Sequence, residues 1–108
     1  MMPFDTKLND AQIELLSLAA EECAETIQAI TKILRHGYDS VNPLVDNSPT
    51  NREHLEKEIG DLTAAVAMLC ASGDISKVTY LHHANEKVAK VGQWLHFTKM
   101  TNDQSPAA

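Results

Sequence analysis

The chain has 108 residues, of which 44% are hydrophobic but only 5% aromatic, and its formal net charge is −6. This length predicts one domain, and a core of aliphatic side chains suits helices better than a sandwich of strands. The acidic balance, without a cluster of Lys or Arg, argues against a nucleic-acid-binding surface. An anionic substrate would need a bound cation.

The first expected element is a helix that begins after Asn9 or Asp10 and ends at Gly37. Its apolar residues recur at alternate spacings of three and four, and we expect the following stripe to face the core: Ile13, Leu16, Ala20, Cys23, Ile27, Ile30 and Leu34. A second apolar stripe consists of Leu15, Leu18, Ala29 and Ile33. A helix that is apolar on two sides needs two covers, so we expect another subunit to supply one of them.

A long loop is expected at residues 37–50, because prolines, aspartates and asparagines break regular structure there. Loops of this length in compact domains are often functional lids or mobile segments. An idle insertion is an equally good interpretation. The sequence therefore leaves the role of this loop open.

Two more helices follow the loop. The second begins with a capping-box pattern at Thr50 to Glu53 and ends at Ser72 and Gly73, and its apolar stripe is Leu55, Ile59, Leu62, Val66 and Leu69. The third begins near Asp74 or Ser76 and keeps its apolar pattern to Leu95. We predict an all-α antiparallel bundle of three main helices within residues 1–98, completed as a homodimer or homotetramer, and a disordered tail at residues 99–108.

Two pairs of acidic residues have the same spacing on neighbouring helices. Glu22 and Glu25 are three residues apart on the first helix, and Glu58 and Asp61 are three apart on the second, so each pair shares one helix face. Each pair also begins one residue before a member of the expected core stripe. If these stripes pack together, four carboxylates converge.

Converging carboxylates raise one another's pKa or bind a compensating cation. Ligation by oxygen alone favours Mg²⁺, Mn²⁺ or Ca²⁺ over zinc. The alternative is that the four acids are ordinary solvated residues, since acidic pairs three apart are common on exposed helix faces.

The run LAAEECAETIQAITKILRHG, followed by HLEKEIGDLTAAVAML, resembles the signature of the MazG-like all-α NTP pyrophosphatases, which is EExxE on one helix and ExxD on the next. The resemblance covers most of residues 10–99 and extends into KVGQWLHFTK, as in small phage-type members. One departure is the separation of Glu25 from Glu58 by 32 residues, which exceeds the usual spacing because the loop is long.

The resemblance implies hydrolysis of nucleoside triphosphates, often deoxynucleotides, to monophosphate and pyrophosphate. It implies that Glu22, Glu25, Glu58 and Asp61 hold Mg²⁺, with Mn²⁺ as a possible substitute, and that Glu21 is a supporting or solvated acid. Family members often contact the nucleotide through an Asn on the third helix, which points to Asn85. The triphosphate also needs nearby cations, for which the candidates are Lys32, Arg35, Lys87 and Lys90, although ordinary solvated side chains are the alternative.

Several other chemistries are excluded or disfavoured by the sequence. There is no ExxH spacing, which argues against a di-iron carboxylate centre, and no glycine-rich phosphate loop. His82 and His83 are adjacent and diverge on a helix. No export signal or membrane-length apolar run is present, so we expect a cytoplasmic protein, located in the host cytoplasm if it is phage-encoded. We expect Cys23 and Cys70 to be buried free thiols.

Two alternative functions remain open at this point. One is hydrolysis of alarmones of the guanosine tetraphosphate type by the same acidic site. The other is a non-enzymatic helical adaptor that uses the second apolar stripe to bind a partner.

Overall fold

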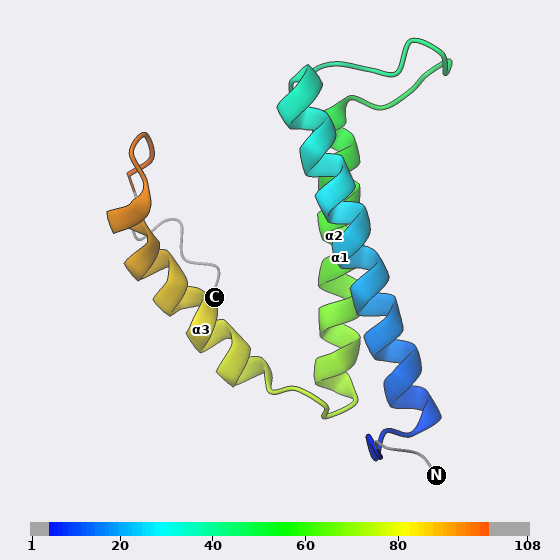
Figure 1. The fold of residues 1–108 in the computed structure, drawn as a ribbon, viewed down its shortest axis with the longest axis vertical. Helices are drawn as coiled ribbons and strands as arrows, with labels where there is room; N and C mark the ends of the chain where they lie inside the picture. Colours follow the sequence, from blue (N-terminus) through cyan, green and yellow to red (C-terminus); the bar gives the residue numbers. More distant parts are fainter. Residues whose placement is uncertain (1–4, 100–108) are drawn as a thin grey trace. The chain divides into compact units, whose positions relative to one another are not determined.

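A computed structural model describes residues 5–99, which contain three α-helices, one short 3₁₀ turn and no strand (Figure 1). The helices are α1 (Asp10–His36), α2 (Asn51–Ala71) and α3 (Lys77–Val91), and the 3₁₀ turn is η1 (Gly92–Trp94). The predicted all-α class is confirmed. The predicted disordered tail falls on residues 100–108, apart from Lys99, and so lies outside the described residues.

Local capping explains where α1 begins and ends. The Asn9 side chain accepts a hydrogen bond from the Gln12 amide at 2.8 Å, and the Gln12 side chain accepts one from the Asn9 amide at 2.9 Å. This reciprocal pair is a capping box. At the other end Gly37 has φ +88°, a conformation that favours glycine, and its amide donates to the Ile33 carbonyl at 2.7 Å. Both predicted boundaries are confirmed.

A second capping box starts α2. The Thr50 amide donates to the Glu53 carboxylate at 3.0 Å, and the Glu53 amide donates to the Thr50 hydroxyl at 3.1 Å. In α3 the Ser76 hydroxyl accepts from the Thr79 amide at 3.2 Å. The third helix is shorter than expected, because the α-helix ends at Val91 and the chain continues as a 3₁₀ turn from Gly92.

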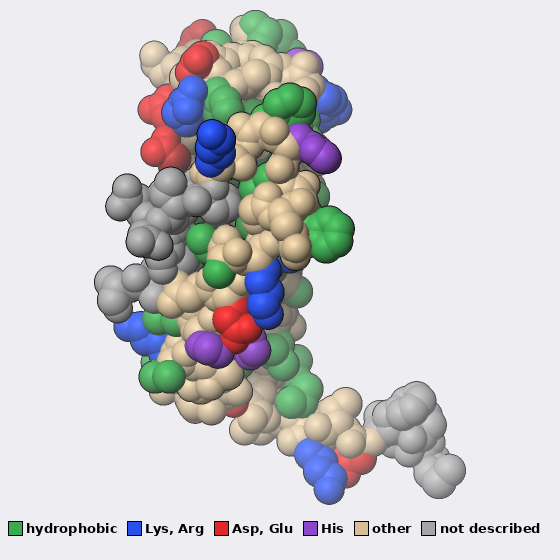
Figure 2. Space-filling view, turned by 90° about the vertical axis from the view of Figure 1, so that its left-hand side faces the viewer, with side chains coloured by type: hydrophobic (Ala, Val, Ile, Leu, Met, Phe, Trp, Pro, Cys, Tyr) green, Lys and Arg blue, Asp and Glu red, His purple; other side chains and the backbone are tan. Residues whose placement is uncertain are grey.

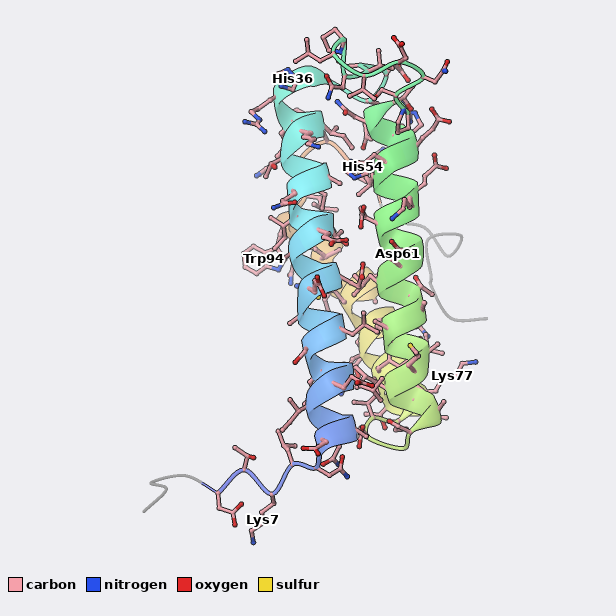
Figure 3. All side chains as sticks on the ribbon, turned by 90° about the vertical axis from the view of Figure 1, so that its right-hand side faces the viewer. Lys7, His36, His54, Asp61, Lys77 and Trp94 are labelled. Carbon is pink, nitrogen blue, oxygen red and sulfur yellow. The ribbon has the colours of Figure 1, made fainter. Side chains whose placement is uncertain are left out.

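The chain forms two compact units, the first ending at Ala71 and the second beginning at Ser72. In the first unit α1 and α2 lie side by side as an antiparallel hairpin closed by loop 37–50 (Figure 3). In the second unit α3 packs with η1. The predicted packing of the third helix into a bundle with the other two, and the predicted single domain over residues 1–98, stay predictions. No helix within the described residues is both long enough and apolar enough to cross a membrane.

The face that α1 buries is the opposite of the predicted one. Ala29, from the second apolar stripe, is fully buried, and the other members of that stripe are half-buried. The stripe predicted to form the core is exposed, with Ile27 at 62% and Leu34 at 80% of full exposure. Within the hairpin the roles expected of the two stripes are therefore reversed, because the stripe expected to face the core is exposed and the second stripe meets α2. Hydrophobic side chains are visible among polar ones on the surface (Figure 2).

One further expectation fails for the same reason. Cys23 belongs to the exposed stripe and is itself exposed, so it is not a buried thiol, while Cys70 is half-buried. On α2 the members of the predicted stripe are buried or half-buried except Ile59, which is 47% exposed. Both stripes of α1 have helical spacing, so spacing alone does not predict which of them packs against α2. The stripe that contains the small residue Ala29 is the one that does.

The contact between the helices depends on small side chains. Ala29 on α1 and Ala65 on α2 are 0% and 2% exposed, and Leu69 is 7% exposed. Close packing leaves no room for extra methylene groups at such positions. The buried core of the hairpin is correspondingly small.

We expect Ala65→Leu to lower the free energy of unfolding by about 1–3 kcal/mol, because the larger side chain would force the helices apart. Ala67→Leu is the matched control, since Ala67 is exposed on the same helix and its replacement should change stability by less than about 0.5 kcal/mol. Denaturant unfolding of both variants measures the difference. Equal stability of the two variants would contradict the proposed helix contact.

Candidate metal centre

Four carboxylates converge between the two helices of the hairpin. Glu22 and Glu25 come from α1, Glu58 and Asp61 come from α2, and one oxygen of each lies within 4.8 Å of the others. Glu58 is only 5% exposed, and the other three are half-buried. The structure thus brings together all four acids that the sequence singled out.

The acids converge because they occupy the seam between the helices, not because they flank an apolar core stripe. On α1 the half-buried Glu22 and Glu25 follow Leu18 and precede the buried Ala29. On α2 Glu58 occupies a buried position of the same kind, one turn before Leu62. A carboxylate loses its hydration at such a position, so this arrangement is costly without a compensating partner.

The crowding of negative charge is reflected in the protonation of Glu25. A hydrogen bond with the Glu58 side chain raises the pKa of Glu25 above its usual value of 4.5, and repulsion from Glu22 and partial desolvation add to this effect. The nearby Glu21, which is exposed, contributes a smaller repulsion in the same direction. The cluster therefore favours a bound proton or another cation at Glu25.

Two basic side chains that the sequence analysis missed contact the acids. His54 Nε2 lies 3.2 Å from Glu58 Oε1. Lys57 Nζ lies 2.8 Å from Asp61 Oδ2 and 3.6 Å from Glu58 Oε1, and its hydrogen bond to Asp61 is the main reason why the pKa of Lys57 is raised. Both residues precede an acid by four positions, the spacing of side-chain pairs on a helix, which is the signal that would have identified them.

The donor set of this cluster fits a hard divalent cation. Glu22 Oε2 and Glu58 Oε2 are buried, and neither has a hydrogen-bond partner within the part of the chain that the structure describes. Buried polar atoms are normally satisfied, so orphaned oxygens at one place call for a bound ion or water. Ligands that are all carboxylate oxygens suit Mg²⁺ or Mn²⁺.

The other predicted site residues are distributed over both units. Lys32 and Arg35 line a pocket at the loop end of the same hairpin. Asn85, Lys87 and Lys90 lie on α3, where Asn85 is half-buried and Lys90 already pairs with a carboxylate on its own helix. Contact of any of these five residues with a nucleotide stays a prediction.

The fold and the cluster define an all-α protein with a four-carboxylate site on a helical hairpin. The family model of the MazG nucleotide pyrophosphohydrolase domain matches residues 11–95, and the chain belongs to this family. Members of the family are nucleotide pyrophosphohydrolases that typically use a divalent metal ion. Comparisons with curated proteins and with solved structures gave no match.

We expect the metal-free protein to gain stability as the pH falls from neutral toward 4.5. Since the pKa of Glu25 is raised in the folded chain, the folded state binds this proton more tightly than the unfolded state does. The resulting stabilisation is complete below the usual value of 4.5 and is lost as the pH rises through the raised pKa. Thermal melting in a chelator, measured over this pH range, tests the expectation.

Glu25→Gln should remove this part of the pH dependence, because an amide does not titrate. Glu14→Gln is the control, since Glu14 is exposed on the same helix. Identical pH profiles for Glu25→Gln and the unmodified protein would show that Glu25 does not carry the effect.

Proposed function

We propose that this protein is a Mg²⁺-dependent nucleoside triphosphate pyrophosphohydrolase that converts (d)NTP to (d)NMP and pyrophosphate, with Mn²⁺ as a possible substitute. The observation that carries the proposal is the cluster of Glu22, Glu25, Glu58 and Asp61, with its two orphaned buried oxygens, in a chain of the MazG family. We place the activity in the cytoplasm, where nucleotide pools are found.

In the proposed reaction a water oxygen attacks the α-phosphorus and forms a new P–O bond. The bond between the α-phosphorus and the oxygen that bridges to the β-phosphorus breaks, and that oxygen leaves with pyrophosphate. One proton of the water is released. A divalent cation bound by the four carboxylates would neutralise charge on the phosphate oxygens and lower the pKa of a water molecule.

The residues of the cluster have distinct parts in this proposal. The four carboxylates would hold the cation, and one of them would orient the attacking water and receive its proton. His54 and Lys57 hold the carboxylates of Glu58 and Asp61 in place through their contacts. These two basic residues are positioning residues in this scheme.

The substrate carries more negative charge than one or two metal ions cancel. We therefore propose that cations of the chain share in binding it, with Lys32 and Arg35 contributing from the hairpin. Asn85, Lys87 and Lys90 are proposed to contact the nucleotide from α3, as the family resemblance implies for the Asn. The preferred base and sugar are left open by these assignments.

We further propose that the protein works as a homodimer or homotetramer. The exposed stripe of α1 runs from Ile13 to Leu34, along most of a helix of 27 residues. Contiguous exposed apolar surface of this kind commonly marks an interface in soluble proteins. A second copy with the same face would cover it symmetrically.

We expect Glu58→Gln to lower turnover by at least about a hundredfold, because loss of even a residue that only supports a metal ligand costs 10–100-fold. The measurement is release of pyrophosphate from a panel of dNTPs and NTPs with Mg²⁺ present. Glu56→Gln, an exposed acid of the same helix, is the control and should keep full activity. Full activity in Glu58→Gln would show that the cluster is not the metal site.

The same assay on the unmodified protein distinguishes the proposed function from its two alternatives. Hydrolysis of guanosine tetraphosphate without hydrolysis of any triphosphate would replace the proposed substrate by an alarmone. A folded protein that hydrolyses nothing, binds no Mg²⁺ by calorimetry and is not stabilised by nucleotides would be the non-enzymatic adaptor.

We expect Ile27→Glu to convert the assembly to a monomer, since Ile27 lies in the middle of the exposed stripe and a buried unpaired carboxylate is costly at an interface. Gln28→Glu adds the same charge at the next position and should leave the assembly intact. Sedimentation velocity gives the mass of each. A monomeric unmodified protein at working concentrations would refute the proposed oligomer.

A further inference from the structure

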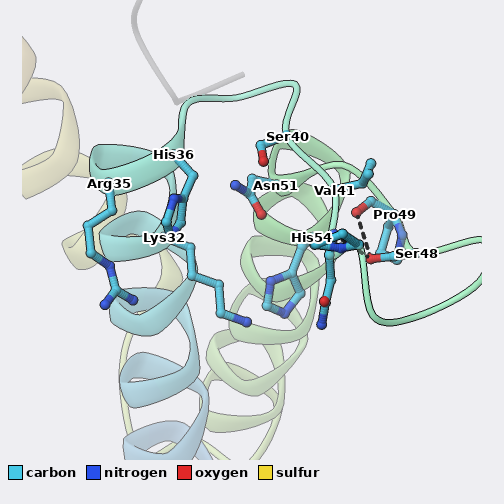
Figure 4. Close-up of a pocket in the computed structure, with 11 residues that line it drawn as sticks. Lys32, Arg35, His36, Ser40, Val41, Ser48, Pro49, Asn51 and His54 are labelled. Carbon is cyan, nitrogen blue, oxygen red and sulfur yellow. Dashed lines mark hydrogen bonds between the residues drawn. The ribbon is translucent and has the colours of Figure 1, made fainter.

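A pocket of about 680 Å³ lies at the loop end of the hairpin, between the last turns of α1, loop 37–50 and the first turn of α2 (Figure 4). Its volume is within the range of small-molecule sites. The loop is anchored across the start of α2, because the Asn51 amide donates to the Ser40 carbonyl and the Arg52 amide donates to the Tyr38 carbonyl, both at 2.9 Å. The long loop thus forms one wall of a defined cavity.

The pocket is basic on its helical side. Lys32, Arg35, His36 and His54 line it, and none of the lining residues, all of which the structure describes, is acidic. Lys32 is directed toward His54 across the space between the helices. Arg35 also lines the pocket, but its side chain is directed away from His54 (Figure 4). Lys32 is therefore the cation best placed to meet a ligand inside.

This basic pocket adjoins the acidic cluster. Lys32 follows Glu25 by seven residues, so it lies two turns further along the same face of α1. His54 precedes Glu58 by four residues and contacts it at 3.2 Å, so one side chain touches the cluster and lines the pocket. The hairpin therefore carries an acidic, metal-binding segment followed, toward the loop, by a cationic one.

The lining also favours phosphate over a nucleobase. Its described residues include no Phe, Tyr or Trp, and the rings among them are the imidazoles of His36 and His54, whose N–H groups can also donate to phosphate oxygens. Hydroxyl and amide groups are also present, from Ser40, Asn42 and Asn51, whereas the Ser48 hydroxyl already donates to the Pro49 carbonyl at 3.3 Å. Such groups, together with a lysine, are suitable donors to phosphate oxygens.

We propose that this pocket binds the β- and γ-phosphates of the triphosphate, the part that leaves as pyrophosphate, and that Lys32 is its main charged contact. The proposal rests on the proposed function, in which the acidic cluster and its cation hold the α-phosphate. It assigns the long loop a part in binding the leaving group, and it places the nucleoside on the other side of the cluster.

The test is calorimetric titration of inorganic pyrophosphate, and separately of a deoxynucleoside monophosphate, into the full chain with Mg²⁺ present. We expect Lys32→Ala to weaken pyrophosphate binding about tenfold or more, the usual effect of losing a hydrogen bond to a charged group, and to leave monophosphate binding unchanged. Lys32→Arg should restore most of the affinity. Lys77→Ala removes an exposed lysine of α3 and should have no effect.

The inference is overturned if the unmodified protein does not bind pyrophosphate, if Lys32→Ala binds it normally, or if that variant loses affinity for the monophosphate instead. Circular dichroism shows whether each variant is folded. If Lys32→Ala is not folded, the pyrophosphate affinity of Lys32→Arg still tests the proposal. The two proposals fail separately. Normal triphosphate turnover with unchanged pyrophosphate affinity in Lys32→Ala removes the pocket assignment and the substrate contact of Lys32 but leaves the proposed reaction, whereas lysine-dependent pyrophosphate binding without any turnover removes only the proposed reaction.

Discussion

Repulsion between carboxylates inside the α1–α2 seam is the constraint on which the rest of this structure depends. Glu58 is almost fully buried, and oxygens of Glu22 and Glu58 lack partners among the described residues. Partial compensation comes from His54 and Lys57, which contact the α2 acids from the same helix. The remaining negative charge is what makes a divalent cation the natural occupant.

This constraint shapes how the helices pack. Positions that would hold large aliphatic side chains in an ordinary helical hairpin are taken by acids, and the closest contacts are made by Ala29 and Ala65. Several large aliphatic residues of α1 lie on its other face, where Ile27 and Leu34 are exposed. The functional seam and the apolar face are therefore two sides of one helix, which connects the proposed chemistry to the proposed assembly.

Along the hairpin, the sign of the charge changes over a short distance. The four acids lie near the middle of the helices, and the pocket lined by Lys32, His36 and His54 lies at the loop end. A triphosphate matches that order of charges if the metal ion at the acids binds its α-phosphate and the basic pocket binds its β- and γ-phosphates. The loop, whose role the sequence left open, contributes a wall of the pocket because its first residues, Tyr38 and Ser40, accept hydrogen bonds from the start of α2.

The sequence by itself determined the helices and the spacing of the acids, because both depend on local interactions. The members of the capping pairs Asn9–Gln12 and Thr50–Glu53 are three positions apart, and Gly37 ends its helix through its own backbone conformation. Only the tertiary structure decided which of the two stripes of α1 faces α2, since both have helical periodicity and neither is excluded by spacing. It also showed the pocket, which exists only because distant residues of the loop and both helices meet.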